Sequence, residues 1–339
     1  MIETPGQAKK TDVVTRVSLD SLKREIGKVI VGNDSVVEQL LTAVFAGGHI
    51  LLEGVPGLGK TLLVRTVSGC LQQSFKRIQF TPDLMPADII GTKLIQEDES
   101  GRRSFVFEAG PIFANMILAD EINRATAKTQ SALLEAMAEG TVTASGETYS
   151  LVKPFFVMAT QNPIEMEGTY PLPEAQVDRF MFKILLDIPT KEMLEGILDR
   201  TTGNEFPLPE LVMTGDDIVK AQKQVRDVPI AKHLREAIAA IIMNTQPKSA
   251  NAPQAVKRFV AFGSSPRGLQ AVALAAKSLA YLKGMNHVSF EEIKAVAKPA
   301  LRHRLILNFE GEAEGVNTDE VIDKLVAQIE SSLAMGKPS

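Results

Sequence analysis

The sequence predicts an α/β fold in which a parallel sheet lies between helices, followed by a C-terminal half built of helices. Short apolar runs alternate with helical periodicity up to Pro189, whereas only helical periodicity remains from Thr190 onward. A phosphate-binding motif also follows directly after one apolar run, which is the strand–loop–helix context that this motif requires. We therefore expect two domains, with boundaries at residues 1–189 and 190–339.

The N-terminal segment is expected to contribute two helices before the motif. Residues 1–17 are polar and are expected to be frayed, and apolar residues then recur at helical spacing from Ser18 to Ile30 and from Asp34 to Ala46. Ile30 and Val31 lie between these helices. Two interpretations of this pair stay open, which are packing in the core and an apolar wall for an adenine ring.

Residues 54–61 read Gly-Val-Pro-Gly-Leu-Gly-Lys-Thr and match the pattern G-x-x-x-x-G-K-[ST]. Glycines allow a tight turn close to an anion, and the N–H groups of the loop and of the following helix bind phosphate oxygens. Lys60 is expected to reach the β- and γ-phosphates, and the Thr61 hydroxyl is expected to hold Mg²⁺. The alternative is a glycine-rich turn that binds nothing. The predicted nucleotide contacts are Gly54, Pro56, Gly57, Leu58, Gly59, Lys60, Thr61 and Leu62.

Further strands and two hairpins are expected in the first half. The expected strands are Phe75–Phe80, Asn115–Ala119, Phe155–Ala159 and Met181–Leu186. One hairpin would pair Lys93–Ile95 with Ser104–Phe107, and the other would pair Thr141–Ala144 with Tyr149–Val152. The first of these is either a contact surface or a solvated loop. The residues from Thr126 to Glu139 are expected to form a helix that ends at Gly140.

Two adjacent acids, Asp120 and Glu121, end the apolar run at 115–119. Ligands bind at the carboxyl ends of strands in open α/β sheets, and unpaired buried carboxylates are costly, so we expect a cation nearby. Asp120 is assigned to Mg²⁺ and Glu121 to the base that polarises the attacking water. The alternative for this pair is a role at a helix N-terminus, where acids are favoured.

Three more polar residues are candidates, each with a structural alternative. Asn162 follows a buried strand and either orients the attacking water or forms a turn before Pro163. Arg179 follows an acidic helical turn and could be a surface charge. Arg267 opens a helix, where its charge opposes the helix dipole, so a purely structural role is disfavoured. The helices expected after residue 190 are Lys191–Asp199, Thr214–Val225, Ala231–Thr245, Pro266–Lys283, Ser289–Lys298 and Thr318–Leu333.

Composition limits the classes of function. The net charge of −4 argues against a dominant basic face for nucleic acid. Cys70 is the single cysteine, so an intramolecular disulfide is excluded. No apolar run approaches the roughly 18 residues of a membrane span, and the start lacks the apolar segment of a signal peptide. A cytoplasmic protein is expected.

The motifs together resemble those of the MoxR-type ATPases of the AAA+ superfamily, from about residue 18 to 335. The segments that carry the resemblance are 54–61, Leu118–Ala125, Ala159–Pro163, Glu174–Phe180 and Ser265–Arg267. The resemblance implies an AAA+ P-loop NTPase core, an all-helical lid, and ATP with Mg²⁺ as cofactors. It also assigns Asn162 to sensor 1, Arg267 to sensor 2 and Arg179 to an arginine finger that acts on the neighbouring subunit's nucleotide.

The resemblance further implies a ring, with a hexamer as the working form, and poor hydrolysis by a lone monomer. It implies chaperone-like remodelling of client proteins or metal-cofactor insertion, with a von Willebrand factor A domain protein as partner. Two other classes were weighed. A nucleic-acid motor lacks a basic–aromatic stripe or an added DNA-binding module. A scaffold that binds ATP without turnover conflicts with the intact Asp120, Glu121 and Arg179. No chemistry is assigned to Arg124 or to residues 302–304.

Overall fold

A parallel sheet forms the centre of the N-terminal half of the computed structural model, which describes residues 19–55, 57–97, 101, 103–162, 168–203 and 207–335. Within these residues the sheet has the strand order β2-β5-β8-β1-β9. Its strands are β1 Ile50–Glu53, β2 Phe75–Gln79, β5 Met116–Asp120, β8 Phe156–Gln161 and β9 Phe182–Leu185. All neighbouring pairs are parallel, so the loops after β1, β5 and β8 meet at one edge, which we call the carboxyl edge.

Alternate residues of the central strands enter two hydrophobic clusters, because successive side chains of a strand point to opposite faces. In β5, Met116 and Leu118 join one cluster, whereas Ile117 and Ala119 join the other. The first cluster is covered by α1 (Leu19–Val29), α2 and α3, and the second by α5. Burial on both faces explains why these strands are continuous apolar runs in the sequence.

Three helices of the core agree closely with the helices expected from the sequence. They are α2 Asp34–Ala46, α3 Lys60–Cys70 and α5 Ala127–Glu139. Gly140 follows α5 with φ 65°, as expected of a residue that ends a helix. The expectation for residues 1–17, together with Ser18, lies outside the described residues.

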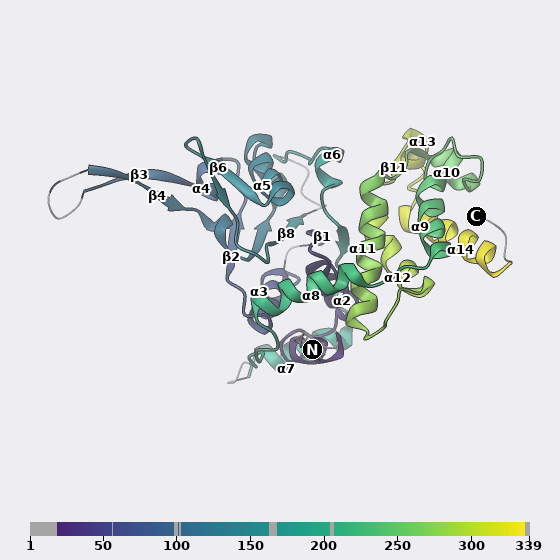
Figure 1. Cartoon of the computed structure of the whole chain (residues 1–339), viewed down its shortest axis with the longest axis horizontal. Coiled ribbons are helices and arrows are strands. Elements are labelled where there is room, and N and C mark those ends of the chain that lie inside the picture. The colour runs from purple at the N-terminus through teal and green to yellow at the C-terminus, as the bar shows by residue number, and fades with distance from the viewer. Residues whose placement is uncertain are drawn as a thin grey trace, which may run out of the picture.

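Two hairpins project from the core, and Figure 1 shows β3 and β4 extending furthest from the sheet. β3 (Gly91–Glu97) pairs antiparallel with β4 (Arg103–Ala109), and α4 (Pro86–Ile90) precedes them. This hairpin is longer than predicted. β6 (Thr141–Ala144) pairs with β7 (Glu147–Ser150), so β7 begins and ends two residues earlier than predicted, because Ser145 and Gly146 adopt positive φ and form the tight turn.

The described residues after β9 form helices and loops apart from one small ladder, β10 (Val260–Phe262) with β11 (Ile306–Leu307). The helices are α7 Lys191–Thr201, α8 Gly215–Asp227, α9 Lys232–Asn244, α10 Gln254–Phe259, α11 Pro266–Leu282, α12 Phe290–Leu301, α13 Phe309–Ala313 and α14 Thr318–Ala334. The ladder, α10 and α13 were not predicted, since segments of two to six residues carry too little periodicity.

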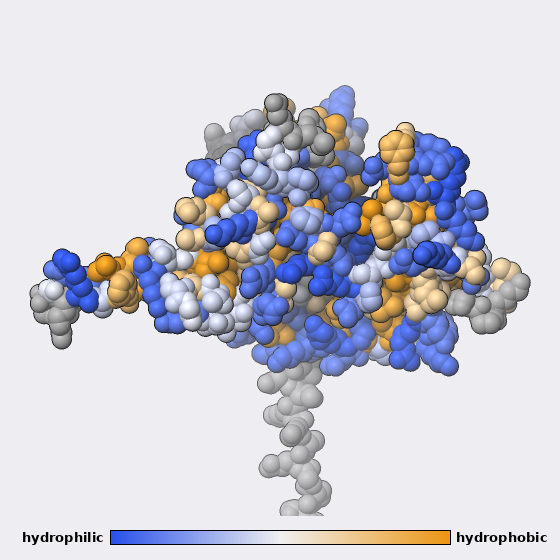
Figure 2. Space-filling model, turned by 90° about the horizontal axis from the view of Figure 1, so that it is seen from above, coloured by the Kyte–Doolittle hydropathy of each residue, from blue (hydrophilic) through white to orange (hydrophobic). Residues whose placement is uncertain are grey.

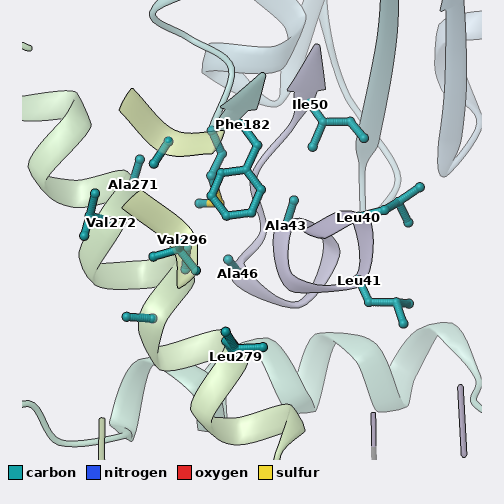
Figure 3. Close-up of a cluster of buried hydrophobic side chains, with 14 of the residues drawn as sticks. Leu40, Leu41, Ala43, Ala46, Ile50, Phe182, Ala271, Val272, Leu279 and Val296 are labelled. Atoms are coloured by element: carbon teal, nitrogen blue, oxygen red, sulfur yellow. The ribbon is translucent and has the colours of Figure 1, made fainter. Parts of the chain in front are cut away.

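The helical half packs directly on the core. Helix α11 lies against α2, α8 and α12. Figure 3 shows Leu40, Ala43 and Ala46 of α2 in one cluster with Leu279 of α11 and Val296 of α12. The same cluster includes Ile50 of β1 and Phe182 of β9. The hydrophobic core is therefore shared by residues before and after position 189. A movement of the helical half would displace β9.

Candidate nucleotide-binding and hydrolysis site

The phosphate-loop motif connects β1 to α3 at the carboxyl edge of the sheet. Gly57 and Gly59 have φ of 86° and 75°, which are left-handed values that disfavour any residue with a Cβ atom. Helix α3 begins at Lys60, so its N-terminal N–H groups face the loop. Gly57, Gly59 and the start of α3 thus have the geometry that the motif predicts, and Pro56 lies outside the described residues.

Lys60 closes the loop on itself. Its Nζ donates a 2.6 Å hydrogen bond to the carbonyl oxygen of Gly54, the first residue of the motif. Half-burial lowers the pKa of the Lys60 ammonium, and the negative charges of Asp120, Glu121 and Glu53 act in the opposite direction. The amine is therefore held between the loop and the two acids that follow β5.

Asp120 and Glu121 are joined by the hydroxyl of Thr160 on the neighbouring strand β8. Thr160 Oγ1 donates to Asp120 Oδ1 at 2.6 Å and accepts the backbone N–H of Glu121 at 2.8 Å. Glu121 itself has φ 55° and ψ 50°, a left-handed conformation that is uncommon for a residue other than glycine. The turn places the two carboxylates at the carboxyl edge, and neither acid starts a long helix, since only the short η2 (Ile122–Arg124) follows.

The side chain of Glu121 is held by two groups to which the sequence assigned no chemistry. Gln79 Nε2, at the end of β2, donates to Glu121 Oε2 at 2.8 Å. Arg124 Nε lies 3.2 Å from the same oxygen. Arg124, which had no assigned chemistry, is thus an ion-pair partner of the proposed base. Asp120 has a comparable cation, because Arg77 Nη2 of β2 lies 2.6 Å from its Oδ2.

Asn162 comes directly after β8, between the strands that carry the acids and the loop. The backbone N–H of Gly54 lies 3.5 Å from the carbonyl oxygen of Gln161, so this end of β8 is next to the first residue of the loop. Asn162 is buried, unlike an ordinary turn residue at the surface. Asn162 thus lies directly after a buried strand, as the sequence predicted.

The donors for Mg²⁺ would be the Thr61 hydroxyl and the Asp120 carboxylate. Among the described residues, no three His, Cys, Asp or Glu side chains gather into a metal site. This finding fits the motif, because Mg²⁺ in such sites takes few protein ligands and completes its shell with waters and nucleotide phosphates. Oxygen donors of this kind are the ones Mg²⁺ prefers, so the residues present fit the ion.

Ile30 and Val31 contact helix α7 in the structure. A Cβ at Gly196 would lie 2.8 Å from Val31 Cγ1, so Val31 packs closely over this glycine. The carbonyl oxygen of Ile30 accepts a 3.3 Å hydrogen bond from Arg200 Nη1. Both residues thus contact α7, and their role as an apolar wall for an adenine ring stays a prediction. A cavity of about 420 Å³ lies beside them and is lined by Val29 and Leu62 together with Arg65, Thr66, Gly69, Arg200, Thr201 and Pro207–Pro209.

Arg179 lies near the amino ends of β1 and β9, which are opposite the carboxyl edge of the sheet. The N–H of Met181 donates to His49, which precedes β1, and Phe182 pairs with Ile50, the first residue of β1. The loop motif begins after Glu53, the last residue of β1, so the strand length of roughly 13 Å separates the two positions. The Arg179 guanidinium donates from Nη1 to the carbonyl oxygen of Leu134 at 2.6 Å.

Arg267 lies with Arg179 rather than with the loop. Its Nη1 is 3.8 Å from Asp178 Oδ2, and Ser265, which begins α11, donates to the same oxygen at 2.9 Å. The predicted site residues thus form two groups. Lys60, Thr61, Asp120, Glu121 and Asn162 gather at the carboxyl edge, whereas Arg179 and Arg267 meet at the other edge through Asp178.

Two family models and several relatives match this chain. Residues 49–182 match the model of the ATPase family associated with various cellular activities (AAA), and residues 253–325 match that of the AAA lid domain. The chain is 42% identical over 305 residues to Chaperone MoxR1 of Mycobacterium tuberculosis, covering 90% of this chain and 80% of that protein. The chain belongs to the MoxR family of AAA+ ATPases.

Two further relatives support this assignment. The Protein MoxR of Methylorubrum extorquens is 32% identical over 319 residues, covering 89% of this chain and 91% of that protein. A crystal structure of a protein from Cytophaga hutchinsonii, provisionally named an ATPase, superposes with a TM-score of 0.85 at 42% identity, covering 91% of this chain and 93% of that one. The AAA+ core and the helical lid of the MoxR family are therefore present here.

Sequence reasoning gave no chemical role to Gln79, Thr160, Asp178 or Arg304, which contact or directly neighbour the candidate site residues. Thr160 and Asp178 lie inside the motif segments, so position alone could have suggested them. Gln79 is one of several exposed polar residues of an edge strand, and the pattern does not distinguish it. Among the described residues of this MoxR-family chain, no helix is long and apolar enough to cross a bilayer.

Proposed function

We propose that the protein hydrolyses ATP with Mg²⁺ as an ATPase whose working form is a ring, with a hexamer expected. Lys60 and the loop N–H groups would bind the phosphates, and Thr61 with Asp120 would hold the metal ion, which neutralises charge on the phosphates. Glu121 would accept a proton from the attacking water, and Asn162 would orient that water. The observation that carries this proposal is the convergence of these residues from three segments of the chain at the carboxyl edge of the sheet.

The opposite location of Arg179 supports hydrolysis between subunits. A guanidinium beyond the amino end of β1 is too far from its own loop to contact the phosphates there, since a strand length of roughly 13 Å intervenes. A hollow of about 540 Å³ beside Arg179 is lined by Ser131, Leu134, Glu135, Glu139 and Gln176. A neighbouring subunit could therefore present its nucleotide to Arg179, and Arg267 would approach it on the same side.

Client handling is the finer part of the proposal. One relative is named a chaperone, and the hairpin β3–β4 exposes Leu94, Ile95, Phe105 and Val106. Figure 2 shows hydrophobic surface along this projecting hairpin. We propose this hairpin as the contact for a protein client, in remodelling or metal-cofactor insertion, with a von Willebrand factor A domain protein as partner. Residues 1–189 would act as the core and residues 190–339 as the lid, in the cytoplasm.

The test is the ATPase rate per subunit as a function of protein concentration, with light scattering measured in parallel. The native chain should show a rate per subunit that rises as the mass of the assembly rises. The Arg179→Ala variant should bind ATP and assemble normally, yet lose roughly 10³-fold in rate, the lower end of the range for an arginine finger. Arg258→Ala, which removes an exposed arginine of the lid that pairs with Glu310, is the matched control.

A rate per subunit that is independent of concentration and of Arg179 would overturn the ring proposal and leave a monomeric ATPase. Loss of ATP binding in Arg179→Ala would instead place this residue in its own subunit's site. If the native chain binds ATP but does not hydrolyse it at any protein concentration, the result would support a scaffold that binds ATP without turnover.

A further inference from the structure

Arg304 is a buried arginine of the lid whose guanidinium binds the core. It follows α12, and 3% of its side chain is exposed. Burial lowers the pKa of Arg304, and the hydrogen bond and charge of Asp178 oppose this effect. A buried guanidinium is costly unless each of its donors is satisfied, so its partners indicate what the protein gains from it.

All five N–H donors of this guanidinium have acceptors. Nε donates to Asp178 Oδ1 at 2.7 Å, and Nη2 donates to the carbonyl oxygens of Asp178 at 2.9 Å and Phe180 at 2.7 Å. Nη1 donates to the carbonyl oxygens of Met181, at 3.2 Å, and Ala300. Four of the five acceptors therefore belong to residues 178–181 of the core.

The partners of Arg304 lie on both sides of Arg179 in the chain. Nη2 binds the carbonyl groups of residues 178 and 180, which are the residues immediately before and after Arg179. His303 adds a contact, since its Nε2 lies 3.1 Å from the carbonyl oxygen of Phe180. The backbone that carries Arg179 is thus fixed to the lid rather than to the sheet alone.

The first turn of α11 lies against the Arg304 side chain. A Cβ at Gly268 would lie 3.0 Å from Arg304 Cδ, so a larger residue there would crowd the arginine. Asp178, which binds Arg304, also accepts the hydrogen bond from Ser265 and lies 3.8 Å from Arg267. The Asp178 carboxylate therefore contacts three lid residues, Ser265, Arg267 and Arg304. Asp178 directly precedes Arg179 in the chain.

We propose that Arg304, acting through Asp178, is a positioning residue that sets the orientation of Arg179 according to the position of the subunit's own lid. A shift of the lid would move the carbonyl groups of residues 178 and 180 and with them the guanidinium offered to the neighbouring subunit. This inference rests on the proposed function, because it requires Arg179 to act between subunits. It gives Arg304 a role that the sequence left unassigned.

The first measurement uses Arg304→Lys, in which an ammonium keeps the charge but cannot span the four carbonyl groups. We expect kcat to fall roughly 10- to 100-fold, as for a catalytic group displaced by about 1 Å, while the Kd for ATP changes less than about twofold. Arg258→Lys, an exposed lid arginine paired with Glu310 and Glu314, is the control and should keep the native kcat. Thermal melting checks that each variant is folded.

The decisive measurement mixes subunits. Arg304→Lys keeps its own hydrolysis residues, whereas Glu121→Gln loses the base but keeps a well-placed Arg179. Mixed 1:1, they should recover about a quarter of the native rate, because random neighbours in a closed ring give half of the Arg304→Lys subunits an intact neighbour. The same rescue of Arg179→Ala by Glu121→Gln tests the proposed function independently.

The outcomes separate the two proposals. If Glu121→Gln rescues Arg179→Ala but not Arg304→Lys, Arg304 acts on its own subunit's site or on folding, and the inference is wrong while the ring mechanism stands. If neither is rescued, the action of Arg179 between subunits is wrong. A native kcat for Arg304→Lys would also overturn the inference. Should Arg304→Lys fail to fold, Asp178→Asn undergoes the same mixing test with the same expected rescue.

Discussion

The Thr160 hydroxyl donates a 2.6 Å hydrogen bond to the carboxylate of Asp120 and is fully buried. Because the same hydroxyl accepts the N–H of Glu121 at 2.8 Å, one threonine on β8 fixes both acids at the end of β5. The orientation of the proposed metal ligand and the proposed base therefore depends on a hydroxyl group that is buried away from the surface.

Replacing Thr160 with valine should expose this dependence. Valine keeps the shape but leaves the N–H of Glu121 without its acceptor, so the free energy of unfolding should fall by about 1–3 kcal/mol. The ATPase kcat should fall by about tenfold, since both acids lose a constraint. Thr160→Ser keeps the hydroxyl and is the control. Chemical denaturation and steady-state kinetics would measure both effects, and a valine variant equal to the native protein in both would refute the role.

Glu121→Gln should preserve ATP binding and remove turnover. An amide cannot accept the proton of the attacking water, and general bases contribute roughly 10²–10⁴-fold to rate. The glutamine keeps an oxygen within reach of Gln79 Nε2, so the local structure should persist. Glu320→Gln, at an exposed position of α14, is the control. Single-turnover hydrolysis and equilibrium nucleotide binding are the measurements, and hydrolysis near the native rate would exclude Glu121 as the base.

Acid should destabilise the protein through His49. Its Nδ1 accepts the N–H of Val157 at 3.1 Å and its Nε2 lies 3.2 Å from the carbonyl oxygen of Met137, a pairing that suits the neutral ring. Burial lowers the pKa of His49 to about 4, below the 6.5 of an exposed histidine. The unfolded state therefore takes up the proton first, so the stabilisation is complete above pH 6.5 and is lost as pH falls toward 4.

Between pH 7.5 and 5.5 this residue should lower the free energy of unfolding by about 1 kcal/mol. Burial also lowers the pKa of His303 well below 6.5, which adds a loss of the same sign. Urea titrations at several pH values should give a smaller pH slope for His49→Gln than for the native chain. Equal slopes would mean that His49 titrates alike in the folded and unfolded states.

The two hairpins should separate when Tyr149 is removed. The rings of Phe107 and Tyr149 stack with centroids 4.2 Å apart, and Lys93 pairs with Glu147 at 2.8 Å. An aromatic pair contributes about 0.5–1.5 kcal/mol, so Tyr149→Ala should raise the rate of trypsin cleavage after Arg103 roughly 2- to 10-fold. Tyr149→Phe retains the stacking and should behave as the native chain. Equal cleavage of all three proteins would show that the stacked pair does not restrain the hairpin.

The sequence predicted the central strands and the long helices well, because these elements bury regular apolar stripes. Helix α2 has the predicted bounds of Asp34–Ala46. Weak local signals gave the errors. The turn at Ser145 and Gly146 places β7 earlier in the chain than predicted. The ladder of β10 with β11 was not predicted, because its strands pair across a long stretch of chain. Strand propensity and hydrophobic periodicity depend on residues that are close in the sequence, so they do not predict pairing between distant segments.

The sequence by itself determined the phosphate-loop motif and the two acids at the end of β5. Their chemistry is local, since the spacing of glycines, Lys60 and Thr61 sets the loop, and the end of an apolar strand sets Asp120 and Glu121. Only the tertiary structure decided which arginines lie close together. Asp178 meets Ser265 from 87 positions away and Arg304 from 126 positions away. Contacts of that separation arise when the helical half packs on the core, and no periodicity in the sequence encodes them.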